Sequence, residues 1–238
     1  MKNKILILGD GLLGTELHTQ SGYEVISRKK DGFDITDIKT YQNLLKIEHG
    51  VIQYCPYDVI INCIANTDTY SDDREGHWNV NYKGTYDLID FCNKWQIKLV
   101  HISTDHVYAN SRSNALETDV PIHSENWYGY TKLLADGLIQ LQCKNYLLCR
   151  CTHKPTPFPY ETAWIDQIGN FDYVDKISNL IIQLIEKDVS GIYNVGTGLK
   201  SIYELASKTK DILPSQKPIS APGNTTMDIR KMKSELGI

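Results

Sequence analysis

The glycine-rich segment 9–14 constrains the fold of this chain more than any other feature of its sequence. It reads Gly-Asp-Gly-Leu-Leu-Gly, follows directly after the short apolar run 4–8, and precedes a helical pattern. A strand, a tight glycine turn and a helix in this order typically open a Rossmann-type, doubly wound α/β fold. The glycines let a diphosphate approach the backbone, and the N–H groups at the start of the helix can bind its charge. The segment therefore predicts a dinucleotide site at Gly9, Gly11, Leu12, Leu13 and Gly14.

Strand-like runs alternate with longer helical patterns through the chain, at 4–8, 23–27, 58–63, 99–103 and 146–151. This alternation predicts a parallel sheet with helices on both faces. Beyond the proline cluster at 155–159, helices are expected near 174–187, near 202–213 and from about 228. The sequence thus predicts a dinucleotide-binding domain over residues 1–152. A small, reduced C-terminal substrate lobe over 153–238 is expected to be partly interleaved with it.

One predicted helix, within residues 72–95, carries an unusual number of aromatic side chains. At helical spacing these residues form one stripe, which we expect to be buried in the core rather than to bind a ligand. The stripe consists of Trp78, Tyr82, Tyr86, Ile89 and Trp95.

Composition excludes several classes of function. The chain has 25 Lys and Arg against 29 Asp and Glu, a net charge of −4, and so no broad basic field that would draw it to nucleic acid or a membrane surface. The apolar run 5–8 is far shorter than a secretory core segment or a membrane span, so we expect a cytoplasmic protein. The six cysteines form no CxxC pair and are expected to be reduced thiols. The seven histidines are scattered, so no metal site is expected, and surface or core roles are assigned to them.

The residues after the second predicted strand indicate which dinucleotide binds. An NAD site usually carries Asp or Glu there to bind the ribose hydroxyls, whereas this chain reads Ser27-Arg28-Lys29-Lys30. A cationic side chain at that position can pair with a 2′-phosphate. NADPH is therefore the expected cofactor, with Arg28 as its contact and NADH as the alternative, while Lys29 and Lys30 fit a solvated turn equally well.

A tyrosine and a lysine four residues apart, Tyr128 and Lys132, begin another predicted helix. This spacing places both side chains on one helix face, where the ammonium can lower the pKa of the phenol toward neutral pH. Tyr128 could then exchange a proton with a carbonyl oxygen while a hydride moves. Thr104 follows the strand at 99–103, at the sheet edge where ligands bind in this fold, and could hydrogen-bond the same oxygen.

Together these motifs resemble the extended short-chain dehydrogenase/reductases and, among them, the dTDP-4-dehydrorhamnose reductases. The resemblance runs from about residue 4 to 236 and is weakest between 150 and 171. Besides the glycine turn and Tyr128 with Lys132, it rests on Asp-Ile-Thr-Asp at 34–37, Asn-Cys-Ile-Ala at 62–65, Asn-Tyr-Lys-Gly-Thr at 81–85, Ser-Thr-Asp at 103–105 and Asn-Thr-Thr-Met-Asp at 224–228.

The resemblance implies a Thr-Tyr-Lys site for NADPH-dependent reduction of the C4 keto group of a nucleotide-linked 4-keto-6-deoxy sugar. Tyr128 would be the proton donor, Thr104 would polarise the carbonyl, and Lys132 would also hold the nicotinamide ribose. Asn81 would support the site without reacting. Further contacts are implied for the adenine at Asp34 and Ile35, for the cofactor at Cys63, Ile64 and Ala65, and for the substrate at Asp105 and His106.

The chain departs from the family's pattern at three places. Its glycine turn is one residue shorter than the usual GxxGxxG, and the stretch from 150 to 175 is compact where relatives build much of their sugar-nucleotide lobe. Third, His106 follows Asp105, where the related 4,6-dehydratases carry a glutamate needed to eliminate water. The last difference favours simple reduction, with His106 as a wall of the site or as an acid near neutral pH.

Two alternatives stay open. A nucleotide-sugar epimerase, or a combined epimerase and reductase, would use the same Tyr-Lys pair and would hold its cofactor tightly. A non-catalytic regulatory subunit is the second alternative, because the regulatory subunit of methionine adenosyltransferase resembles the same reductases. The nucleotide, the sugar stereochemistry and assembly as a homodimer are also left open by the sequence.

Overall fold

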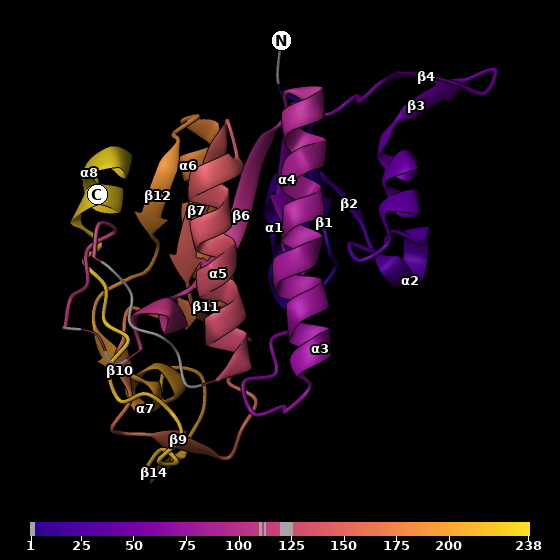
Figure 1. Ribbon diagram of the computed structural model, residues 1–238. Coiled ribbons are helices and arrows are strands. Elements are labelled where there is room, and N and C mark those ends of the chain that lie inside the picture. Colours follow the sequence, from indigo (N-terminus) through magenta and orange to yellow (C-terminus); the bar gives the residue numbers. More distant parts are fainter. Residues whose placement is uncertain (1–2, 110, 112, 120–125) are drawn as a thin grey trace. The chain divides into compact units, whose positions relative to one another are not determined.

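The computed structural model describes residues 3–109, 111, 113–119 and 126–238 (Figure 1). Its six-stranded sheet has the order β12-β7-β6-β5-β1-β2, and the ladders that join β2, β1, β5 and β6 are parallel. All five predicted strands are present, and the predicted Rossmann-type α/β fold is confirmed. The strands of this sheet are β1 (Ile5–Leu8), β2 (Glu24–Ile26), β5 (Val59–Asn62), β6 (Lys98–Thr104), β7 (Tyr146–Cys151) and β12 (Gly191–Asn194).

The chain divides into two compact units, one of residues 1–102 and 125–148, the other of residues 103–124 and 149–238. Strands β6 and β7 therefore each contribute residues to both units. The domain boundary expected after residue 152 stays a prediction.

The first unit contains the glycine segment and several helices. Figure 1 shows α4 and α5 side by side along their length. Strand β5, which precedes both helices in the chain, is wholly buried, as expected for a central strand. The helical elements of this unit are α1 (Leu12–Ser21), α2 (Arg28–Asp31), η1 (Ile38–Leu44), α3 (Arg74–His77), η2 (Trp78–Lys83), α4 (Gly84–Trp95) and α5 (Trp127–Gln142).

The helix expected within residues 72–95 is confirmed, but its predicted aromatic stripe is wrong. Trp78 and Tyr86 are 37% and 41% exposed, and of the five stripe residues only Ile89 is fully buried. The cause is η2, a π-helical segment, whose turns hold more residues than α-helical turns. Residues that an α-helical spacing would place on one face therefore lie on different faces before and after this segment. The buried face of α4 instead consists of Gly84, Thr85, Leu88, Ile89, Phe91 and Cys92.

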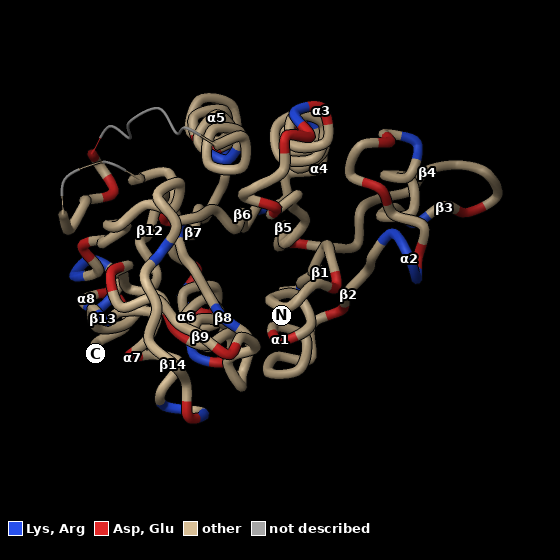
Figure 2. Tube along the Cα trace, turned by 90° about the horizontal axis from the view of Figure 1, so that it is seen from below, with Lys and Arg blue, Asp and Glu red and all other residues tan. Residues whose placement is uncertain are grey.

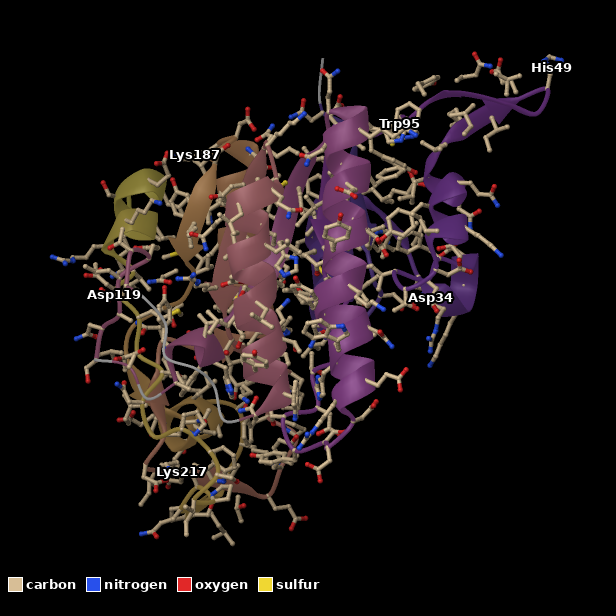
Figure 3. The ribbon with its side chains drawn as sticks, in the orientation of Figure 1. Asp34, His49, Trp95, Asp119, Lys187 and Lys217 are labelled. Atoms are coloured by element: carbon tan, nitrogen blue, oxygen red, sulfur yellow. The ribbon has the colours of Figure 1, made fainter. Side chains whose placement is uncertain are left out.

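A hairpin of β3 (Lys46–Glu48) and β4 (Val51–Tyr54) was not predicted. Its two-residue turn has positive φ at both His49 (51°) and Gly50 (75°), as a type I′ turn requires. Figure 3 shows His49 at the tip of this hairpin. Both strands are exposed along their whole length, so burial does not specify them.

The second unit combines helices with three two-stranded sheets, β10-β13, β11-β8 and β14-β9. A core of Phe158, Phe171, Tyr173 and Leu205 lies among them. Helix α7 is shorter than the expected 202–213, because Lys208 and Thr209 donate to carbonyls three residues earlier and end the α-helical pattern. The elements are η3 (Asp105–Tyr108), β8 (His153–Lys154), β9 (Thr162–Trp164), β10 (Ile168–Gly169), β11 (Asp172–Tyr173), α6 (Val174–Glu186), β13 (Lys200–Ser201), α7 (Ile202–Ala206), β14 (Leu213–Ser215) and α8 (Arg230–Leu236).

Candidate active site

The glycine segment joins β1 to α1, and its three glycines serve different purposes. Gly9 has φ 99°, a conformation that favours glycine, and donates its N–H to Ile26 O at 2.8 Å. A methyl group on Gly14 would lie only 1.9 Å from Gly9 O, so the turn and the helix pack without room for a side chain. Gly11, by contrast, has an ordinary φ of −68° and open space where its methyl would be. The fold itself therefore does not require glycine at position 11.

Helix α1 begins at this open space. Its N-cap is Gly11, which has no side chain to cap the first N–H groups, so these groups can bind an anion. Of the two leucines predicted here, Leu12 is 45% exposed and Leu13 is buried. The start of α1 thus has the features expected of a diphosphate site.

The residues after β5 lie against the glycine turn. Cys63 donates its N–H to Leu8 O at 3.0 Å, and a methyl group on Gly9 would lie 2.9 Å from the Ile64 side chain. Cys63, Ile64 and Ala65 are all half-buried. The fold thus brings this predicted cofactor segment and the glycine turn together.

The basic turn after β2 forms α2, seen as a blue segment in Figure 2. No carboxylate follows β2 directly in the sequence, but the fold brings two carboxylates next to the basic side chains of this turn. The Arg28 guanidinium lies 3.4 Å from Asp34, and Lys30 lies 3.2 Å from Asp10 of the glycine turn. Burial raises the pKa of Asp34, but hydrogen bonds from Thr36 and the Arg28 charge outweigh it and hold that pKa below its usual value.

Two of these predicted cofactor contacts differ in their exposure. The Arg28 side chain is 76% exposed, and it can reach a ligand without unfolding any part of α2. Ile35 is buried, and its side chain lies 3.0 Å from the position that a methyl group on Gly84 would take. The side chain of Ile35 therefore belongs to the core of the first unit.

Tyr128 and Lys132 both lie on α5, which begins where the Asn126 side chain accepts the N–H of Gly129. Tyr128 is half-buried in the first turn, whereas Lys132 is only 1% exposed. The Lys132 ammonium is 2.7 Å from Ile102 O and 2.9 Å from His101 Nε2, both in β6. Lys132 is thereby fixed to the end of a central strand.

Asn81 ties α5 to the loop that follows β5. Its amide accepts the N–H of Asn66 at 2.8 Å and donates to Asn66 O at 3.0 Å and to Thr131 Oγ1 at 3.1 Å. Because Asn81 lies in the π-helical segment η2, the irregular turn presents it to both partners. This geometry is compatible with the supporting role that the resemblance implies for Asn81.

Thr104, Asp105 and His106 belong to the second unit. Thr104 Oγ1 accepts the N–H of His106 at 3.1 Å and caps η3, and the buried Asp105 carboxylate accepts the Thr152 hydroxyl. Burial lowers the pKa of His106, Asp105 opposes this and Lys154 adds to it, with a net lowering. His106 is therefore uncharged near neutral pH, which favours a wall of the site over a charged acid.

His153 and Lys154 were not predicted as site residues. They form β8, which begins two residues after β7 ends, and electrostatic interactions link both of them to Asp105. Burial lowers the pKa of both side chains, that of His153 to about 4. The available signal was their position at the carboxyl end of a predicted strand, where polar residues line ligand sites in this fold.

We expect His153→Gln to make stability less sensitive to acid. The pKa of His153 is about 4 in the folded protein and about 6.5 when unfolded, so the unfolded state takes up a proton first as the pH falls below 6.5. The free energy of unfolding is therefore highest above pH 6.5 and falls as the pH is lowered toward 4. By pH 5 the loss is about 2 kcal/mol. Urea unfolding at pH 7 and pH 5 measures this loss, and an equal loss in the wild type and the variant would contradict the assignment.

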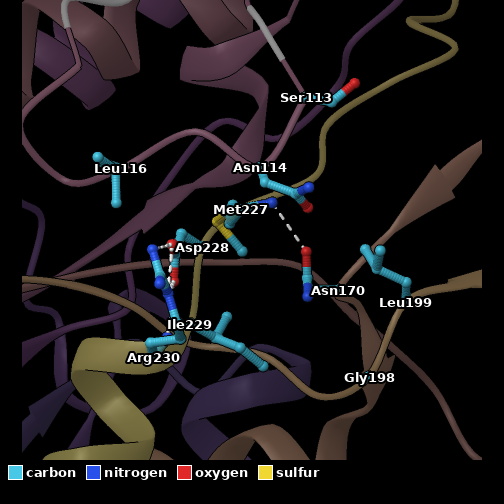
Figure 4. A pocket seen from close by; sticks show the side chains of 10 residues that line it. All are labelled: Ser113, Asn114, Leu116, Asn170, Gly198, Leu199, Met227, Asp228, Ile229 and Arg230. Carbon is cyan, nitrogen blue, oxygen red and sulfur yellow. Dashed lines mark hydrogen bonds and ion pairs between the residues drawn. The ribbon is translucent and has the colours of Figure 1, made fainter.

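The second unit also contains a cavity of about 640 Å³ (Figure 4). Several of its polar lining groups bind other groups of the protein. Asn170 Oδ1 accepts the N–H of Met227 at 2.8 Å, and Arg230 pairs with Asp228. The volume lies within the range of small-molecule sites. Other lining residues are Ser113, Asn114, Leu116, Gly198, Leu199 and Ile229.

Two kinds of feature are absent from the described residues. No helix among them combines the length and the apolar character needed to cross a membrane. Nor do their His, Cys, Asp and Glu side chains form a group of three or more that could hold a metal ion.

Comparison with known proteins places this geometry in a family. The chain is 28% identical over 226 residues to the spore coat polysaccharide biosynthesis protein SpsK of Bacillus subtilis, covering 86% of this chain and 77% of that protein. It is 25% identical to a dTDP-4-dehydrorhamnose reductase of Mycolicibacterium smegmatis, covering 88% and 69%. A crystal structure of dTDP-4-dehydrorhamnose reductase from Bacillus anthracis in complex with NADP superimposes with a TM-score of 0.79 at 24% identity, covering 98% and 93%. The sequence model of the RmlD substrate binding domain family matches residues 3–153, more than half of the chain. This chain therefore belongs to the RmlD substrate binding domain family.

Proposed function

We propose that this protein is an NADPH-dependent oxidoreductase that reduces the 4-keto group of a nucleotide-linked 4-keto-6-deoxy sugar. One observation carries the proposal. The first unit combines a glycine turn at an open helix start with a Tyr128–Lys132 pair on α5, whose lysine is fixed to the end of β6. The family and the names of the relatives support the same reaction, and the Bacillus anthracis reductase was crystallised as a complex with NADP.

The residues at the glycine turn fit a dinucleotide. The space beside Gly11 is open, although the fold does not require glycine there. The uncapped N–H groups at the start of α1 can bind an anion. We assign the diphosphate to this turn and the 2′-phosphate to Arg28. Bound there, NADPH would supply the hydride.

The other half of the reaction is a proton transfer that the chain's own residues perform. Tyr128 would donate its phenol proton to the carbonyl oxygen, and the Lys132 ammonium, one turn later on the same helix face, would stabilise the phenolate. Thr104, the last residue of β6, is the proposed hydrogen-bond donor to the same oxygen. Asp105 and His106 are proposed to border the sugar.

The test follows NADPH oxidation with dTDP-, UDP- and GDP-linked 4-keto-6-deoxyhexoses. We expect turnover with one nucleotide class and none when Tyr128 is replaced by phenylalanine. If the cofactor binds and no sugar turns over, the proposal fails and a regulatory role takes its place. Cofactor that survives purification together with interconversion of sugar stereoisomers would instead establish an epimerase.

Arg28→Glu is expected to weaken NADPH binding at least about 10-fold, because a charge-assisted bond to the 2′-phosphate is lost and a like charge replaces it. NADH binding should change by less than about threefold, since NADH lacks that phosphate. Fluorescence titration with both cofactors measures the two affinities. Lys29→Glu is the matched control, because it changes the net charge equally at the next, exposed residue. Equal losses for NADPH and NADH would rule out the assignment of Arg28.

A further inference from the structure

Lys132 is a cation buried almost entirely inside the first unit, so its ammonium depends on hydrogen-bond partners within the protein. Removing a charge from water is costly unless hydrogen-bond partners compensate. Its partners include the carbonyl of Ile102 at 2.7 Å and the imidazole of His101, with Nε2 at 2.9 Å. His101 is 0% exposed, and no sequence motif distinguishes it from the other histidines.

On its other side the His101 ring faces the buried side chain of Asn62. Its Nδ1 lies 3.3 Å from the amide nitrogen of Asn62, whose oxygen accepts the N–H of Ile64 at 3.1 Å. Ile64 in turn packs against Gly9 of the glycine turn. A continuous path of contacts therefore runs from the glycine turn through Asn62 and His101 to Lys132.

The distances decide which ring nitrogen carries the hydrogen. An ammonium can only donate, so Nε2 accepts from Lys132 and the hydrogen lies on Nδ1. A neutral imidazole accepts at one nitrogen only, so the charge-assisted contact of 2.9 Å with Lys132 excludes a hydrogen bond from the Asn62 amide to Nδ1, and these two nitrogens, 3.3 Å apart, face each other as donors. The shorter contact sets the tautomer.

We propose that His101 is a positioning residue for Lys132, which it holds in place by accepting a hydrogen bond at Nε2 as a neutral, Nδ1–H imidazole. The role in catalysis rests on the proposed function, because it acts through Lys132. The ring can accept only while it is uncharged. Burial and the Lys132 charge both lower the pKa of His101, so the ring is uncharged at neutral pH.

A pair of amide substitutions tests the proposal through turnover. His101→Gln places its side-chain oxygen near the position of Nε2, whereas the shorter amide of His101→Asn ends near Nδ1 and cannot reach Lys132. We expect His101→Asn to lower kcat at least about 10-fold, with the KM for the sugar nearly unchanged, because a misplaced lysine impairs the chemical step. His101→Gln should recover kcat to within about threefold of the wild type. Equal kcat in the wild type and in folded His101→Asn would overturn the proposal.

Nuclear magnetic resonance of the imidazole nitrogens tests the same contact without any turnover. In the wild type, His101 should show a protonated Nδ1 and an unprotonated Nε2, and it should not titrate between pH 6 and 8. Lys132→Met removes the neighbouring charge and should raise the pKa of His101. An Nε2–H tautomer in the wild type would sink the proposal. The expected spectra in a protein that turns over no sugar would overturn the proposed function and leave the His101–Lys132 contact standing.

Discussion

Tyr128→Phe is expected to lower kcat at least about 100-fold and to leave NADPH affinity within about threefold of the wild type. The substitution removes one oxygen, and with it the proton that the carbonyl oxygen needs as the hydride arrives. The aromatic ring stays, and it is only half-buried in the first turn of α5, so the helix should keep its packing. Stopped-flow single turnovers measure the chemical step, and fluorescence titration measures cofactor binding.

Tyr130→Phe is the matched control for this prediction. Tyr130 lies on the same helix two residues later, is also half-buried, and packs its ring edge-on against Trp127. It faces another side of α5 from Tyr128 and Lys132, and we expect its variant to turn over within about threefold of the wild type. Comparable losses in the two variants would mean that damage to α5, and not loss of a proton donor, lowers activity.

The sequence predicted those parts of the fold that burial specifies. Strands β1 and β5 are mostly apolar and buried, and β6 carries a buried apolar pair, Leu99 and Val100, at its start, so their composition locates all three. Hairpin β3–β4 was missed because none of its residues is buried and its turn is His-Gly rather than a common turn pair. The aromatic stripe of residues 78–95 was wrong because no propensity indicates the π-helical segment that shifts its phase.

The candidate site divides in the same way. Motifs near each other in sequence, such as Gly9 to Gly14 or Tyr128 with Lys132, were recognised because a local spacing fixes their geometry. The pairs Arg28–Asp34 and Lys30–Asp10, and the contact of His101 with Lys132, join residues that only the folded chain brings together. Their partners cannot be read from spacing, since their distances depend on how the helices and strands pack.

The glycine turn supplies the second large effect, a contrast between two identical substitutions three residues apart. Gly14→Ala places a methyl group 1.9 Å from Gly9 O, a clash with backbone that only a shift of α1 can relieve. We expect a loss of about 4 kcal/mol in the free energy of unfolding, among the largest effects of single substitutions. For a chain of this size this corresponds to a fall of roughly 10 °C in Tm.

Gly11→Ala should have the opposite profile. Its φ of −68° suits alanine and its methyl group meets no atom within 4 Å, so Tm should stay within about 2 °C of the wild type. The same methyl group occupies the space that we assign to the diphosphate, and NADPH affinity should fall at least about 10-fold. Thermal unfolding without cofactor and titration with NADPH separate the two effects. Unchanged NADPH affinity in Gly11→Ala would show that the open space at the start of α1 holds no diphosphate, whereas a large fall in its Tm would mean that position 11 needs glycine for folding alone.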